Sequence, residues 1–358
     1  MPSLKEIKGR INSISSTLAI TSAMKMVAAA KLQKAQMAIQ NMLPYERRLH
    51  SMLIDLMGAM NISAAASEDG SVRGSGSAER GFDQSGDRLS LSNRHDLAGM
   101  DGAYSLMAQR EVRKVAIVAF ASNSSLCGAF NSNAIREATA VINEYRALGL
   151  GDADITVYSV GRKMAEAMKK LGFPSPADFT KMSDSPSYEA ASALAQELLD
   201  GFVSGRFDKV ELVYNHYKST SSQPTIRQTY LPLSLADATA DLQAGKIADS
   251  ASESDTNRGA EPVGAPVVRQ GSPTTEDLIV EPSKEELIAT LLPKVVRLRV
   301  FTTLLDSTAA EQAARTVAMQ LATDNGNDLL QELTLEYNKG RQQKITSEIL
   351  DLVGGSMQ

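Results

Sequence analysis

The chain has 358 residues, a formal net charge of −5 and a sequence pI near 5.5, which argues against a protein whose main partner is nucleic acid. Its single cysteine, Cys127, excludes an internal disulfide and a thiolate zinc cage, and its three histidines show no metal-ligand spacing. Aromatic residues make up only 5% of the chain, and the runs rich in Ala, Leu, Lys, Gln and Glu at both ends are typical of helices.

The start of the chain, MPSLKEIKGRINSISS, has no apolar core and no small-residue cleavage site of a secretory signal. It enters a helical pattern within a few residues, unlike a typical transit peptide. No run of about eighteen apolar residues occurs in the sequence. We therefore expect any link to a membrane to pass through a partner.

Residues 1–60 carry a seam of apolar or small side chains with an alternating spacing of three and four. Its positions are Leu4, Ile7, Ile11, Ile14, Leu18, Thr21, Lys25, Ala28, Leu32, Ala35, Ile39 and Met42. This spacing predicts a coiled-coil helix. The spacing resumes after Pro44, so we expect one helix with a kink or a short break there. The polar positions Thr21 and Lys25 either fix the register or contact something other than the partner helix.

Two segments, residues 61–110 and 237–276, differ in composition from the rest of the chain. Both are rich in Gly, Ser and charge and short of large apolar side chains. This composition predicts two flexible insertions.

Residues 111–236 alternate short apolar runs with helical patterns. We expect strands in VRKVAIVAFAS, DITVYSVG, KVELVYNHYK and TIRQTYLPL, with helices between the first three runs. Strands and helices in turn predict an α/β layer with mostly parallel pairing. The runs IVAF and ITVY are apolar at every position or nearly so, as in strands that are covered on both faces.

Residues 277–358 hold a second long helical pattern. Ser283 can cap this helix, which runs to about Val353 and ends at Gly354-Gly355. Roughly seventy helical residues span on the order of 100 Å. Two helices that bracket a globular domain bury their seams only against each other. The predicted fold class is therefore α/β, with a long antiparallel coiled coil of the N- and C-terminal helices plus a central Rossmann-like α/β domain.

Strings at both ends resemble one family. They are LKEIKGRINSISST and ITSAMKMVAAAKLQKAQ near the N-terminus, and AAEQAARTVAMQLATDNGNDLLQELTLEYNKGRQQKITSEILDLVGG near the C-terminus. These strings, with SLCGAFN and VYNHYKSTSSQPT in the centre, resemble the gamma subunits of F-type ATP synthases. The resemblance covers nearly everything outside the two insertions. It implies a non-catalytic rotor in the central stalk, which couples ion flow through a membrane ring to ATP synthesis or hydrolysis.

The resemblance also implies the partners and the location. The partners are the alpha and beta subunits, the epsilon subunit and the membrane rotor ring of c subunits. The chain would be peripheral, on the cytoplasmic face of the bacterial inner membrane, and would hold no cofactor, metal or catalytic residue. The loop before the cysteine reads Asn123-Ser124-Ser125 where the family carries an acidic-basic-glycine triplet. This difference puts in question any polar network built on that triplet.

Five residues match family positions that contact the hexamer of alpha and beta subunits. They are Met24, Lys25 and Met26 on the first helix, and Arg341 and Gln342 on the last helix, which we expect to lie opposite them. Arginine offers fixed, planar donors for carboxylates. The alternative is that Arg341 and Gln342 are ordinary solvated helix residues. Likewise, the many Ala and Met residues near these sites permit close helix approach, but they also suit any helix.

Two enzymatic alternatives remain open at the sequence level. Cys127 follows a strand and precedes a helix, which would suit a nucleophile, but a small, partly buried thiol is favoured because no histidine is near in sequence. The α/β domain invites a nucleotide site, yet neither G-x-G-x-x-G nor G-x-x-x-x-G-K-[ST] occurs. A generic coiled-coil tether is the remaining alternative to a rotor.

Overall fold

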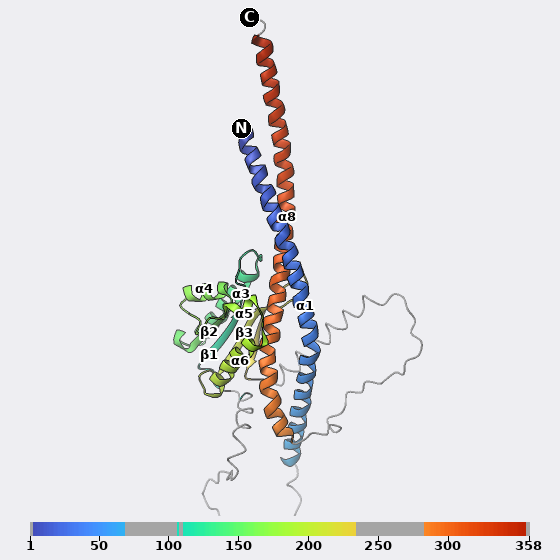
Figure 1. Ribbon diagram of the computed structural model, residues 1–358. Coiled ribbons are helices and arrows are strands. Elements are labelled where there is room, and N and C mark those ends of the chain that lie inside the picture. The colour runs from blue at the N-terminus through green and yellow to red at the C-terminus, as the bar shows by residue number, and fades with distance from the viewer. Residues whose placement is uncertain (1–2, 69–105, 107–109, 234–282, 356–358) are drawn as a thin grey trace, which may run out of the picture.

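A computed structural model describes residues 3–68, 106, 110–233 and 283–355 of the chain (Figure 1). Two long helices, α1 (Leu4–Glu68) and α8 (Lys284–Gly355), run side by side and form a rod that we call the shaft. A small α/β domain, residues 110–233, packs against the side of α8, and we call it the head. The predicted fold class is confirmed.

The predicted seam is the side of α1 that faces α8. All twelve seam positions are buried or half-buried. The Thr323 hydroxyl donates to the Thr21 hydroxyl at 3.1 Å. A Cβ atom on Gly326 would lie 2.7 Å from Leu18, and one on Gly340 would lie 3.2 Å from Leu4. Each step forward along α1 is thus matched by an equal step back along α8, so the coiled coil is antiparallel, as predicted.

Both shaft helices continue through a proline. Pro44 lies inside α1, and the helix has no break there; Pro293 lies inside α8. Helix α1 reaches Glu68. It therefore passes the predicted boundary at residue 60 by two turns, because the alanine-rich run after Met60 suits a helix. The rest of the first predicted insertion, apart from Leu106 and Arg110, and all of the second lie outside the described residues.

The head contains a four-stranded sheet with the order β2-β1-β3-β4. The strands are β1 (Val115–Phe120), β2 (Ile155–Val160), β3 (Lys209–Asn215) and β4 (Thr225–Leu231). Strand β1 pairs in parallel with β2 and β3, and β4 pairs antiparallel with β3. The four predicted strands and their mostly parallel pairing are confirmed.

Helices cover both faces of the sheet. The described helices of the head are α3 (Phe130–Ala147), α4 (Arg162–Lys170), α5 (Thr180–Asp184) and α6 (Tyr188–Val203), with a short 3₁₀ turn at Asp152–Asp154. Val115, Ile117 and Ala119 of β1 join the apolar cluster that contains residues of α3 and α4. Ala116, Val118 and Phe120 join the cluster that contains residues of α6 and α8. Every residue of β1 is buried, as expected for a strand covered on both faces.

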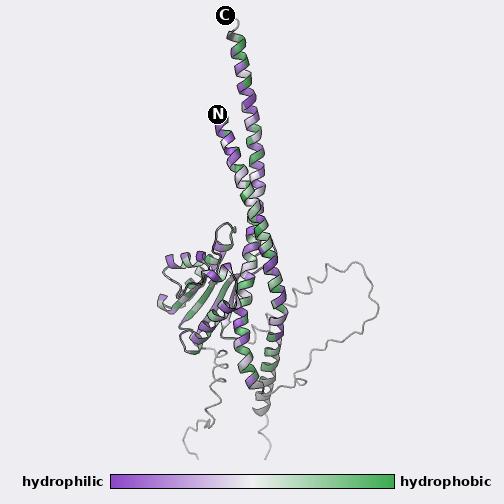
Figure 2. Ribbon diagram, viewed as in Figure 1, coloured by the Kyte–Doolittle hydropathy of each residue, from purple (hydrophilic) through white to green (hydrophobic). Residues whose placement is uncertain are grey.

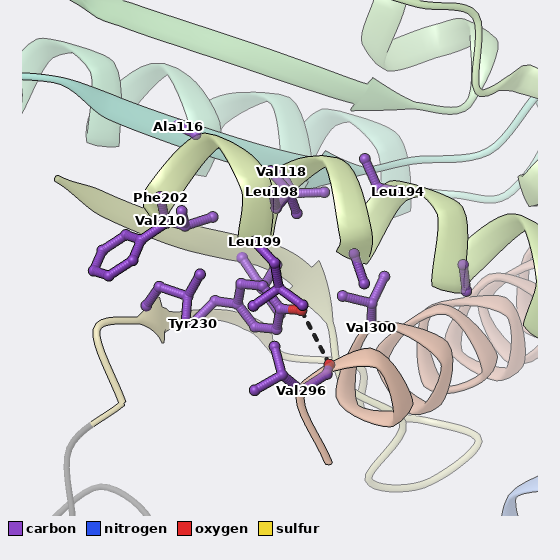
Figure 3. Packing of buried hydrophobic residues seen from close by; sticks show 14 of the residues in the cluster. Ala116, Val118, Leu194, Leu198, Leu199, Phe202, Val210, Tyr230, Val296 and Val300 are labelled. Atoms are coloured by element: carbon purple, nitrogen blue, oxygen red, sulfur yellow. Dashed lines mark hydrogen bonds between the residues drawn. The ribbon is translucent and has the colours of Figure 1, made fainter. Parts of the chain in front are cut away.

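Helix α8 is part of the head as well as part of the shaft. Figure 3 shows Val296 and Val300 of α8 beside Leu198 and Leu199 of α6 in one apolar cluster. The Tyr230 hydroxyl donates to the Val296 carbonyl at 3.0 Å within this cluster. The head and α8 therefore share a core. None of the helices in the described ranges is long and apolar enough to cross a membrane.

Candidate functional site

The predicted contact residues of α1 lie in the middle of the coiled coil. Met24 and Lys25 are half-buried, whereas Met26 is 64% exposed. The neighbouring pair of Thr21 and Thr323 places this turn beside residues near 320 of α8. The turn thus presents Met26 to solvent and leaves Lys25 partly exposed.

Arg341 and Gln342 lie farther along α8, next to the level at which α1 begins. Both are exposed, and they follow Gly340, which packs against Leu4 in the first turn of α1. About twenty residues of α8 separate them from the level of Met24, which corresponds to roughly 30 Å of helix. The expectation that they lie opposite Met24, Lys25 and Met26 is therefore wrong. The antiparallel register pairs Met24 with residues near 320 instead.

The last turns of α8 form an apolar tip that the sequence interpretation missed. Within the described residues, α1 begins at Leu4, beside Gly340, and about fifteen residues of α8 extend past that level for roughly 20 Å. Several large apolar side chains near this end are exposed: Leu335, Ile345, Ile349, Leu350, Leu352 and Val353. Figure 2 shows hydrophobic and hydrophilic positions in alternation along the end of α8 that extends past α1. Clustered exposed apolar side chains usually mark a contact surface.

Three apolar residues of the tip lie on one side of the helix. Ile345, Ile349 and Leu352 are four and three residues apart. The sequence contained this spacing, but it did not contain the register that places these residues past the start of α1.

A polar network joins the head to α8 at the loop Asn123-Ser124-Ser125. Arg315 on α8 donates to the Ser124 hydroxyl at 2.7 Å and pairs with Glu311 at 2.8 Å. Asn123 accepts from the backbone N–H of Arg162 and donates to the carbonyl of Thr180, both at 2.7 Å. Burial raises the pKa of Glu311, and the nearby Arg315 opposes this rise. Ser124 thus bonds the head to α8 through Arg315, whereas Asn123 forms hydrogen bonds within the head.

Cys127 is buried within this loop region and is not placed as a nucleophile. Its side chain is 1% exposed, and the Asn131 amide donates to its Sγ atom at 3.1 Å. The Ser122 hydroxyl lies 3.7 Å away. The sequence favoured a small, partly buried thiol, and the structure buries Cys127 almost completely.

A polar pocket of about 220 Å³ lies in the head beside the start of β2. Its lining includes Lys114, Tyr158, Glu197 and Arg206. The Tyr158 hydroxyl donates to Glu197 at 3.0 Å, and burial together with this carboxylate raises the pKa of Tyr158. In the described part of the chain, the pocket lining contains no Ser, Cys or His, and no group of residues could hold a metal ion.

Comparison with known proteins fits this architecture. The sequence profile of the ATP synthase family matches residues 3–357. An ATP synthase gamma chain from Phocaeicola vulgatus is 46% identical over 357 residues, which cover 100% of both chains. The chain belongs to the ATP synthase gamma chain family.

Other members of the gamma chain family are similar along their whole length. The ATP synthase gamma chain of Bacteroides thetaiotaomicron is 45% identical over 358 residues, which cover 100% of both chains. Among solved structures, one chain of the Euglena gracilis mitochondrial ATP synthase, OSCP/F1/c-ring, matches with a TM-score of 0.52 and 19% identity. The match covers 99% of this chain and 93% of that chain, and it supports the fold alone.

Proposed function

We propose that this gamma-family chain is the rotating central shaft of an F-type ATP synthase, which couples ion flow through a membrane rotor ring to ATP synthesis or hydrolysis. The observation that carries the proposal is the asymmetric rod. It has a single exposed helix at its tip, two helices in its middle and a head on one side (Figure 1). Family membership over the whole chain supports this reading.

An asymmetric rod suits a rotor because each orientation presents a different surface to each surrounding subunit. A ring of alpha and beta subunits around the shaft would contact Met26 on one side of the two-helix part, and α8 on another. A shaft can shift a partner between conformations only through a difference in affinity for them. Rotation of this shaft would therefore change the nucleotide affinity of each beta subunit in turn.

The tip and the middle of the shaft supply two levels of contact. The apolar residues after Gly340 suit a collar of apolar side chains, which holds the tip without directional bonds and lets it turn. Arg341 and Gln342 at the base of the tip are exposed and offer donors to carboxylates of the hexamer beside that collar. Met24, Lys25 and Met26 form the lower level, where thioether side chains adapt to changing surfaces.

The chemistry in this proposal belongs to the partners. The beta subunits hold the catalytic sites, and this chain supplies no catalytic residue and binds no cofactor. The head, and the end of the shaft at which α1 ends and α8 begins, face the epsilon subunit and the membrane ring of c subunits. The chain is peripheral, at the cytoplasmic face of a bacterial inner membrane, and its similarity to gamma chains of bacteria supports this location.

Native mass spectrometry of the complex that a tagged copy of this chain captures from its own cells tests the proposal. We expect one copy with three alpha and three beta subunits. A free monomer, or a complex that lacks those subunits, would overturn the rotor function and favour a tether.

A further inference from the structure

The loop between β3 and β4, residues 216–224, reaches from the head to both helices of the shaft. The backbone N–H of Tyr217 donates to Oδ1 of Asp306 on α8 at 2.9 Å, and Nδ1 of His216 lies 2.6 Å from Oδ2 of the same carboxylate. Nε2 of Gln36 on α1 donates to the Tyr217 hydroxyl at 2.7 Å. Two consecutive loop residues thus bind α8 through one carboxylate and α1 through one amide.

The Tyr217 side chain packs against two apolar clusters. The first lies between the shaft helices and consists of Leu32 and Ala35 on α1 and Ala309 and Ala313 on α8. The second lies between the head and α8 and contains Cys127, Phe130 and Ala310. The alanines on this part of α8 carry only a methyl group, so they leave room for the ring. This gives the Ala-rich run of α8 a specific role beside helix propensity.

The loop is braced by its own hydrogen bonds. The backbone N–H of Ser219 donates to the carbonyl of Ser222 at 3.1 Å, and the reverse bond measures 3.2 Å. The Gln223 amide donates to the carbonyls of Ser219 and Thr220 at 2.9 and 2.6 Å. The backbone N–H of His216 donates to the Pro224 carbonyl at 2.8 Å and closes the loop. A loop held in this way transmits force with little bending.

The two shaft helices are attached to the head differently. Helix α8 contributes to the core of the head over several turns. Helix α1 joins that core through Leu53 and Leu56, near the end of the shaft at which α1 ends and α8 begins. Gln36 lies seventeen residues closer to the N-terminus, roughly 25 Å along the helix. The hydrogen bond between Gln36 and Tyr217 is directional, so at this level it fixes the position of α1 relative to the head.

We propose that residues 216–224 are a bracket that fixes the rotational position of both shaft helices relative to the head, so that torque on the head passes to α1 as well as to α8. Tyr217 is the positioning residue toward α1, and His216 with Asp306 is the fixed end on α8. The mechanical role rests on the rotor function proposed above. The contact itself does not, because it is a property of the isolated chain.

Hydrogen exchange of the full-length chain tests the contact. Tyr217→Phe removes the hydroxyl that binds Gln36 and keeps the ring in place. We expect amides of α1 around Gln36 to exchange about fivefold faster, as the loss of one ordinary hydrogen bond implies. Tyr188→Phe is the matched control, because Tyr188 is a tyrosine of the head that also packs near α8, against Phe301, outside the bracket. Equal exchange rates in wild type and Tyr217→Phe would overturn the proposal.

Rotational fluctuation in the assembled complex tests the mechanical role. With the hexamer fixed and a probe on the head, Tyr217→Phe combined with Asp306→Asn should widen the angular distribution of the probe. Asp200→Asn removes a carboxylate from the head surface and should leave the width unchanged. An unchanged width in the double variant would overturn the role in torque. A wild-type chain that assembles with no alpha or beta subunits would instead refute the rotor function, and the exchange result would still decide whether the bracket exists.

Discussion

Glu211 is a buried carboxylate whose charge is held by three neighbours. Its side chain is 1% exposed, and it binds Nε of Arg227 and the Tyr145 hydroxyl at 2.6 Å and Nζ of Lys209 at 2.7 Å. Burial alone would raise the pKa of Glu211, but the hydrogen bonds from Arg227, Lys209 and Tyr145 outweigh it and lower the pKa. The network ties β3 to β4 and to α3.

Arg227→Met should lower the free energy of unfolding by about 3 kcal/mol, because it removes one partner of a buried charge. Chemical denaturation measures this change. Arg162→Met breaks the exposed pair with Glu166 and should cost less than about 1 kcal/mol. If the two variants are equally stable, the Glu211 network does not stabilise the head.

The same network predicts a dependence on pH. Because the folded-state pKa of Glu211 is lowered, its contribution is fully present above the ordinary pKa of a glutamate. It is lost as the pH falls through the lower, folded-state pKa. Denaturation midpoints measured at a series of acidic pH values should therefore fall more steeply in the wild type than in Glu211→Gln.

The contribution of His216 to stability depends on pH in the opposite direction to that of Glu211. Its hydrogen bond to the Asp306 carboxylate raises the pKa of the imidazole, against the effects of burial and of Lys218. Its contribution is fully present below the ordinary histidine pKa and is lost as the pH rises through the higher, folded-state pKa. An NMR titration of His216 should give a pKa above 6.5, and Asp306→Asn should lower it. An unchanged pKa in this variant would show that the pair does not form in solution.

At the scale of the elements, two glycines of the shaft helices allow the effect of helix propensity on stability to be measured apart from the effect of packing. A Cβ atom on Gly9 of α1 would meet nothing within 4 Å, whereas one on Gly326 of α8 would lie 2.7 Å from Leu18. Gly9→Ala should stabilise the chain by about 0.8 kcal/mol, since alanine favours a helix more than glycine does. Gly326→Ala should gain less or destabilise, because Leu18 must move. Equal gains in thermal stability would mean that the two helices are not in contact at Gly326.

The helices and strands were predictable because their signals are local. The three-and-four spacing from Leu4 to Met42 gave the buried side of α1, and the apolar run IVAF gave the central strand. The register between the helices was not predicted, because the seam positions are alike and several pairings bury them. This explains why Arg341 was expected beside Met24, and why the apolar tip was missed.

The head-to-shaft contacts depend on the fold and have no local signal. Gln36 and Tyr217 are 181 residues apart in the sequence, and no spacing relates them. Glu211 lies in the predicted strand KVELVYNHYK, and only the positions of Tyr145 and Arg227 in the folded head reveal its partners.

At the scale of the whole molecule, we expect the chain to fold without the tip. Truncation after Arg341 removes a part of α8 whose described side chains are exposed, so the free chain should keep its melting temperature. If the tip contacts the hexamer as proposed, assembly with alpha and beta subunits should weaken, and native mass spectrometry would show the loss. Shortening the chain by the same length within α3 would destroy the head and serves as the contrasting case. Normal assembly of the truncated chain would contradict the contact at the tip.

The antiparallel pairing of the first and last helices also determines when the shaft can form during synthesis. Leu4 packs against Gly340, and α8 begins only at Lys284. A ribosome that adds about 5–20 residues per second needs roughly 10 to 50 seconds between the end of α1 and its last partner residues. Throughout this time the apolar side of α1 has no α8 to cover it. The nascent chain thus carries an uncovered apolar helix side for most of its synthesis.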